Sequence, residues 1–380
     1  MLPAMSAHLS TSFIPVCRPQ LPPADAVARY LRLTDAARQY TNRGPLVLQL
    51  EQRLAAAMRL PDHAVRTASN GTSAIEIAVL ARAGTAKSDR PLALIPSYTF
   101  AATGLAAERL GYIPVLADVD PETWAMDHVA AARHPDLDRI GLILDVAPLG
   151  RRPNLAAAEE LHRQTGIPVI IDAAASFEAL LDAPRAASAT VPVTLSFHAT
   201  KTFSTGEGGA VLWDSAPGAE ALMRAANFGF NYSRRSEGDG TNAKMSEINA
   251  AVGLAMLDSF ARRRADYART LDHWRAALAA LPGRCHFAPD LASVYVIWQA
   301  PSGAALTRAQ DALTEARIDS RQWYETGLHS MPHFQRLSKD PAPLPVTEDL
   351  GARLLGLPMA HDLDPAEMAR IVAVIRSSLG

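Results

Sequence analysis

Residues 196–209 read S-F-H-A-T-K-T-F-S-T-G-E-G-G, and the expected fold is organised around this stretch. Short apolar runs precede it at residues 191–197 and follow it at residues 210–213, which predicts two buried strands joined by a tight turn. That turn would present Lys201 among small and hydroxylated residues. A lysine amine held in this way can form a Schiff base with a carbonyl compound. A single loop lysine is more often a solvated surface residue, so the other motifs must decide between the two interpretations.

The composition is that of a folded protein with a sizeable core. The chain has 380 residues, of which 48% are hydrophobic and 20% charged, and its net charge is -2. This charge gives no reason to expect nucleic acid or an anionic membrane as a partner. Cys17 and Cys285 lie far apart and match no metal or redox spacing, so we expect no metal and a reducing, cytoplasmic compartment. The first ten residues lack the pattern of a signal peptide, and no apolar stretch reaches membrane-spanning length.

Strand-like and helix-like segments alternate in the first half of the chain, which predicts an α/β fold with a mainly parallel sheet covered on both faces. The strands are expected at residues 91–96, 112–119, 140–146 and 167–174. Ligands bind beyond the carboxyl ends of such strands. Several small or polar segments follow strand ends and should therefore face one site: residues 69–73, residues 97–100, Asp172 and the lysine loop.

A long periodic segment begins at residue 244 and could continue through an arginine-rich stretch to residue 280. We expect one long helix here, of the kind that commonly bridges two domains. This places a domain boundary near residue 255. The predicted larger domain covers residues 1–255, and a smaller α+β domain covers residues 256–380.

An ordered series of motifs carries a resemblance to a known family. The motifs are N-G-T-S-A (70–74), P-S-Y-T-F-A-A-T (96–103), P-V-L-A-D-V-D-P-E-T (114–123), I-D-A-A-A-S-F (171–177), S-F-H-A-T-K-x-x-x-x-G-E-G-G-A (196–210) and G-T-N-A-K-M-S-E-x-x-A-A (240–251). Together they resemble the DegT/DnrJ/EryC1/StrS aminotransferases, which are fold-type-I, pyridoxal-phosphate-dependent sugar aminotransferases. Residues 44–51 and the tail, 344–359, extend the resemblance over nearly the whole chain.

The resemblance implies a catalytic pair. Lys201 matches the lysine that forms the internal aldimine with pyridoxal 5'-phosphate and later moves protons at the substrate carbon. Asp172 matches the carboxylate that contacts the pyridine nitrogen and keeps it protonated, so that the ring remains an effective electron sink. Without the other motifs, Asp172 would more often be a turn residue at a strand end, because aspartate favours such positions.

Further cofactor-binding residues follow from the same resemblance. Thr72 and Ser73, at a helix start, match a phosphate cradle that Ser196 completes. Phe100 matches the aromatic residue that stacks on the cofactor ring. Asn242 matches an asparagine that reaches the phosphate of the neighbouring subunit's cofactor, which implies a homodimer with composite active sites. Without the resemblance, the segment that contains Thr72 and Ser73 could be an ordinary helix cap, and Phe100 could be a core residue.

The sequence leaves the roles of two positions, Ala175 and His198, undecided. The family often carries Gln or His three residues after the aspartate, where this chain has Ala175, so the hold on cofactor or substrate is expected to differ there. His198 lies three residues before the lysine, and both a packing role and a site role are compatible with the sequence.

The expected substrates are an amino-acid donor, L-glutamate, and a keto sugar attached to a nucleoside diphosphate. Lys244, Arg234 and Arg235 are candidate partners for the diphosphate, and solvated loop charges are the alternative interpretation. An aminocyclitol or another keto compound is an alternative acceptor. A non-catalytic, pyridoxal-binding regulatory protein is a further alternative, although no basic block or spare helix-turn-helix region is visible.

Overall fold

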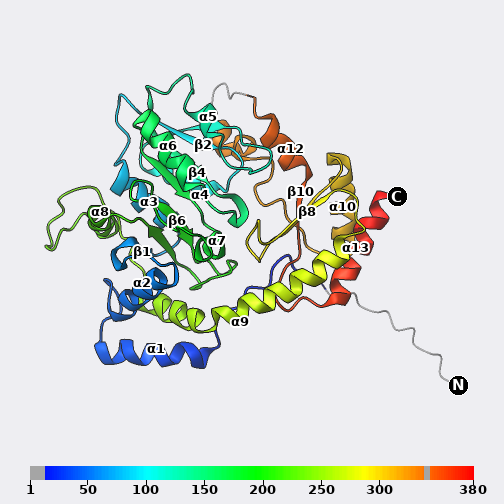
Figure 1. Cartoon of the computed structure of the whole chain (residues 1–380), viewed down its shortest axis with the longest axis horizontal. Helices are drawn as coiled ribbons and strands as arrows, with labels where there is room; N and C mark the ends of the chain where they lie inside the picture. The colour runs from blue at the N-terminus through cyan, green and yellow to red at the C-terminus, as the bar shows by residue number, and fades with distance from the viewer. Residues whose placement is uncertain (1–12, 338–342) are drawn as a thin grey trace.

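The computed structural model describes residues 13–337 and 343–380, and a seven-stranded sheet forms the centre of its larger part (Figure 1). The strand order is β1-β7-β6-β5-β4-β2-β3, in which β7 runs antiparallel to both of its neighbours and the remaining pairs are parallel. The predicted mainly parallel α/β sheet is thereby confirmed. The strands are β1 (Val65–Ala68), β2 (Leu92–Pro96), β3 (Ile113–Ala117), β4 (Ile140–Val146), β5 (Val169–Asp172), β6 (Val193–Ser196) and β7 (Gly209–Leu212).

Helices cover both faces of this sheet, because its strands are apolar on both sides. Neighbouring residues of β5 show the division: Ile171 packs into one apolar cluster and Ile170 into another. The Ile171 cluster includes side chains of α2 (Pro45–Ala57), α6 (Leu155–Thr165) and α7 (Phe177–Leu181). The Ile170 cluster includes side chains of α3 (Gly71–Arg82), α4 (Ala101–Arg109) and α8 (Ala216–Ala226). The large part also contains α1 (Ala24–Ala37) and the short helix α5 (His128–Ala131).

The predicted long helix is α9 (Glu247–Leu278), which runs from the region of α1 and α2 to the C-terminal part of the molecule (Figure 1). Its first half contributes Leu254 and Phe260 to the core of the large sheet, and its second half contributes Trp274 to a separate core. The predicted boundary at residue 255 falls inside this helix and remains a prediction. No helix in the described part of the chain combines the length and the apolarity that crossing a membrane requires.

The C-terminal part is built on a three-stranded antiparallel sheet in the order β10-β9-β8. Its elements are β8 (Arg284–His286), β9 (Val296–Gln299), α10 (Gly303–Glu315), α11 (Pro332–Gln335), α12 (Pro345–Arg353), β10 (Leu354–Leu357) and α13 (Pro365–Leu379). The N-terminal segment joins this part by backbone hydrogen bonds. Ile14 N–H donates to Arg317 O over 3.1 Å, and Met359 N–H donates to Val16 O over 3.0 Å.

Candidate active site

The loop that carries Lys201 connects the neighbouring strands β6 and β7. The two strands are present as predicted, but the expected tight turn between them is wrong, because the connection covers residues 197–208. Backbone bonds close this loop on itself: Phe197 O accepts from Thr205 N–H at 2.9 Å, and Phe197 N–H donates to Gly208 O at 2.8 Å. Phe203 is buried, with its ring stacked on Phe177 at 4.4 Å between centroids. The extra length thus anchors the lysine loop in the core.

Lys201 points toward a tyrosine from the C-terminal part. Its Nζ donates a hydrogen bond to Tyr295 Oη over 3.2 Å and lies 5.9 Å from the centroid of that ring. Tyr295 is buried, and Trp323 packs against it edge to face at 5.1 Å. The amine is therefore held between the lysine loop and the segment that leads into β9.

Asp172 ends β5 and is buried, with only 5% of its surface exposed. Its Oδ2 accepts a hydrogen bond from Thr103 Oγ1 at 2.7 Å, and its Oδ1 accepts from Ala174 N–H at 3.1 Å. Burial raises the pKa of Asp172, while these two bonds and the nearby charge of Lys201 act in the opposite direction. The carboxylate is thus fixed in orientation and has lone pairs left to accept from a ring N–H.

The start of α3 lies against the end of β6, which brings the predicted phosphate residues together. A Cβ atom on Gly71 would lie 2.7 Å from Ser196 Cβ, so only glycine permits this approach. Asn70 Oδ1 accepts from Ser73 N–H at 2.8 Å and caps the helix. The first turn of a helix has N–H groups without intrahelical partners and attracts anions. Thr72, in that same turn, and Ser196 are therefore suited to hold a phosphate.

Phe100 is the N-cap residue of α4, and 62% of its surface is exposed although it is large and apolar. Thr103, which bonds Asp172, lies one turn further along the same helix. The helix start thus combines an open aromatic face with the hydroxyl group that orients the carboxylate. An amine, a carboxylate, an aromatic face and a phosphate seat are the groups that pyridoxal phosphate requires, so the residues present fit this cofactor.

The structure does not bring the four loop residues to Lys201. Asn242 is exposed, and its Oδ1 accepts a hydrogen bond from Lys244 Nζ at 2.7 Å. The same Nζ lies 4.5 Å from the ring centroid of Phe228, and burial lowers the pKa of Lys244. Arg234 and Arg235 are exposed in the same loop. Their predicted roles, toward a neighbouring subunit and a diphosphate, remain predictions.

His198 and Ala175, whose roles the sequence leaves undecided, lie in different surroundings. His198 is exposed, and its Nδ1 lies 2.9 Å from Thr200 Oγ1 within the lysine loop. Ala175 is buried and belongs to the apolar cluster of the C-terminal part. Over residues 13–337 and 343–380, we find no group of three or more His, Cys, Asp or Glu side chains that could hold a metal ion.

The model of the DegT/DnrJ/EryC1/StrS aminotransferase family matches residues 25–376. The chain belongs to this family. It is 32% identical to protein Rv3402c of Mycobacterium tuberculosis, over 96% of this chain and 90% of that protein. It is 28% identical to dTDP-3-amino-3,4,6-trideoxy-alpha-D-glucose transaminase of Streptomyces venezuelae, over 93% and 92% of the two chains. The crystal structure of DesI with its TDP-sugar product has a TM-score of 0.84 at 30% identity, over 96% of this chain and 92% of DesI.

The fold and the family together identify an enzyme, a pyridoxal-phosphate-dependent aminotransferase. Two contacts of its site were not predicted from the sequence. Thr103 stands inside the motif at residues 96–103, and its spacing of one helical turn from Phe100 was the available indication. Tyr295 belongs to no motif of the series, and 94 residues separate it from Lys201 along the chain.

Proposed function

We propose that this aminotransferase moves an amino group from L-glutamate to a keto sugar linked to a nucleoside diphosphate, with its cofactor bound covalently to Lys201. The observation that carries the proposal is the Lys201 amine, bonded to Tyr295 Oη, in the electrostatic range of the buried Asp172 carboxylate, whose pKa burial raises and the lysine charge counteracts. Similarity to a dTDP-sugar transaminase and to a protein crystallised with its TDP-sugar product supports this choice of acceptor.

Each residue of the site has a definite task in this scheme. Pyridoxal phosphate, when bound, supplies an electron sink for the carbon that loses a proton. Asp172, oriented by Thr103, would accept the hydrogen bond of the ring nitrogen. Lys201 would hold the cofactor covalently, and its amine, once free, would move a proton at the substrate carbon. Tyr295 Oη orients that amine through their hydrogen bond.

The proposed enzyme is a homodimer whose sites each draw on both subunits. Asn242 is exposed on a loop that follows α8, as a residue reaching a second subunit must be. Lys244, Arg234 and Arg235 share this loop and supply positive charge for a diphosphate. An interface through this loop would bury the exposed ring of Tyr232, of which 85% is accessible in the single chain.

Spectroscopy tests the covalent link directly. Purified protein loaded with pyridoxal phosphate should show the absorbance band of a lysine-bound cofactor, and Lys201→Ala should lose it. Lys87→Ala is the matched control: it replaces an exposed lysine that is remote in sequence from Lys201, and it should keep the band. If pyridoxal phosphate mixed with the wild-type protein keeps the absorbance spectrum of the free cofactor, the covalent link to Lys201 is overturned.

A coupled assay tests the substrates. With the enzyme present in catalytic amounts, sustained conversion of glutamate to 2-oxoglutarate should require a suitable acceptor. A panel of nucleotide-linked 3-keto and 4-keto sugars, with a keto cyclitol beside them, identifies that acceptor. Turnover with the cyclitol and none with the nucleotide sugars would replace the proposed acceptor while leaving the aminotransferase in place.

A further inference from the structure

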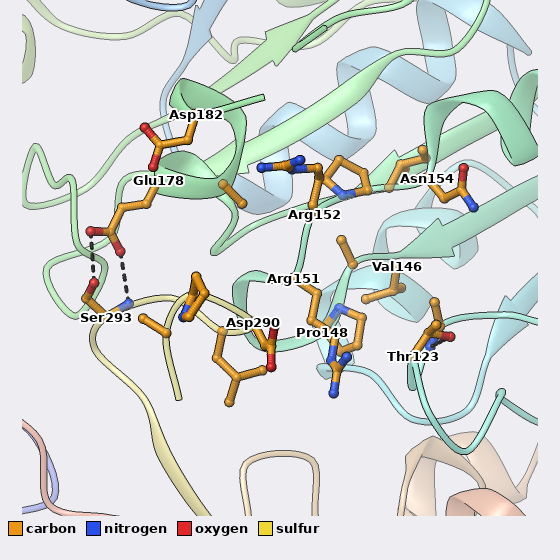
Figure 2. Close-up of a pocket in the computed structure, with 18 of the residues that line it drawn as sticks. Thr123, Val146, Pro148, Arg151, Arg152, Asn154, Glu178, Asp182, Asp290 and Ser293 are labelled. Atoms are coloured by element: carbon orange, nitrogen blue, oxygen red, sulfur yellow. Dashed lines mark hydrogen bonds between the residues drawn. The ribbon is translucent and has the colours of Figure 1, made fainter. Parts of the chain in front are cut away.

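Figure 2 shows a cavity of about 960 Å³ whose lining includes none of the predicted cofactor residues. Its wall comes from the segment that follows β4, from α7, from the middle of α9 and from residues 288–293. Ile171 lines it, and Asp172 is the next residue on the same strand. Because neighbouring strand residues point to opposite faces, this cavity lies across the sheet from the cofactor carboxylate. Its volume is in the range of pockets that bind small molecules.

Most charged side chains of the cavity wall already have partners within the protein. The pairs are His128 with Asp145 at 2.7 Å, Arg264 with Asp182 at 2.5 Å, Glu178 with Ser293 at 2.9 and 3.0 Å, and Arg275 with Asp272 at 2.6 Å. Figure 2 shows the bonded pair Glu178 and Ser293 at one side of the cavity and Arg151, beside Pro148, toward the other. These paired groups need no ligand to compensate their charge.

Arg151 is different. Its guanidinium lies 4.1 Å from the ring centroid of Trp124, and its Nε is enclosed with no hydrogen-bond partner in the described part of the chain. Burial lowers the pKa of Arg151, and the charge of Asp290 opposes this shift only in part. Arg152, the next residue, lines the same cavity, and no ion pair is recorded for it among the described residues. Two adjacent arginines thus line one cavity, with their side chains pointing in different directions (Figure 2), and neither forms an ion pair with a carboxylate of the described residues.

We propose that this cavity binds a small oxyanion, a carboxylate or a phosphate group, on Arg151, with the exposed Arg152 as a second positive charge in its wall. The planar guanidinium presents its N–H groups as a fork that matches two oxygens of such a group. Stacking on Trp124 fixes the plane of the Arg151 fork before the ligand arrives. A bound oxyanion would also compensate the charge of the partly buried guanidinium. Asp290 stands in the same wall and disfavours polyanions, so a single anionic group fits best.

The test uses the cofactor-loaded enzyme, in which the phosphate seat at α3 is already filled. Inorganic phosphate and succinate are titrated in separate experiments and followed by calorimetry. We expect saturable binding of at least one of them, and a loss of affinity of about tenfold or more in Arg151→Gln and in Arg152→Gln. Arg133→Gln, at an exposed arginine outside the cavity wall, should bind as the wild type does.

The two variants keep the result interpretable. Arg152 is exposed, so its replacement tests binding even if Arg151→Gln fails to fold. Preference for phosphate or for succinate identifies the anionic group. The proposal is overturned if neither anion binds the loaded wild-type enzyme, or if the affinity is unchanged in Arg152→Gln and in any folded form of Arg151→Gln. It does not depend on the identity of the keto acceptor.

Discussion

Thr103 Oγ1 donates a hydrogen bond to Asp172 Oδ2 over 2.7 Å, and both side chains are buried. Thr99 Oγ1 lies 2.9 Å from the same hydroxyl and extends the network. Phe100 caps the helix on which Thr103 stands, so a displacement of α4 would move the aromatic face and the carboxylate together. The start of α4 therefore couples Phe100 and Asp172, the two residues predicted to contact the cofactor ring.

Replacing Thr103 by valine removes this hydrogen bond at nearly constant volume. A hydrogen bond to a charged group contributes about 1.5–3 kcal/mol, so the half-reaction with glutamate should slow by roughly 10- to 100-fold. Stopped-flow absorbance of the bound cofactor measures that rate. Thr103→Ser keeps the hydroxyl and should stay near the wild-type rate. Equal rates in the valine and serine variants would contradict the role of the bond.

Gly71→Ala tests the phosphate seat. The new Cβ would lie 2.7 Å from Ser196 Cβ, which forces the helix start away from β6. Overpacking of this kind typically costs about 1–3 kcal/mol, and cofactor affinity should fall by a factor of roughly ten or more. Fluorescence titration with pyridoxal phosphate measures the change. Gly238→Ala meets nothing within 4 Å and is the control that should bind normally.

Mixing two inactive variants tests the composite site. Lys201→Ala and Asn242→Ala each damage every site of their own homodimer if the asparagine acts across the interface. A heterodimer formed from them contains one intact site, so an equimolar mixture after subunit exchange should regain about a quarter of the wild-type activity. Activity that stays at the mean of the two parent variants would show that Asn242 does not serve a neighbouring subunit.

The buried pair of His128 and Asp145 should make stability depend on pH. Burial alone would lower the pKa of His128, but the hydrogen bond and charge of Asp145 outweigh it, so the net shift is upward from 6.5. The pair's contribution to the free energy of unfolding is then full below pH 6.5 and is lost as the pH rises through the raised value. His128→Gln should therefore destabilise the protein more at about pH 6 than at about pH 9, as urea titrations would show. An equal loss at both values would contradict this linkage.

Sequence patterns predicted the large sheet well, because its strands are buried on both faces and read as apolar runs such as Ile140–Val146. The strands β8 and β10 were not predicted. They are short and owe their existence to partners remote along the chain, since Cys285 and Leu355 both pair with Trp298. Periodicity within a short window carries no information about such pairing.

The active site likewise has features that local sequence motifs predict and features that depend on tertiary contacts. The motif around Lys201 and the aspartate at the end of β5 could be predicted, because each motif is local to one strand end. The contact of Tyr295 with Lys201 could not be, since it depends on how the C-terminal part sits against the large sheet. The length of the lysine loop was also missed, because the burial of Phe203 against Phe177 is a tertiary contact.

The attachment of residues 14–17 to the C-terminal part sets an order of events during synthesis on the ribosome. The backbone groups that bond them, at Arg317 and Met359, are made some 300 residues later or more. The large sheet has all of its strands once Leu212 has emerged, so it can form while translation continues. A nascent chain that stops short of Arg317 therefore leaves Ile14 and Val16 without these backbone partners, however complete its sheet.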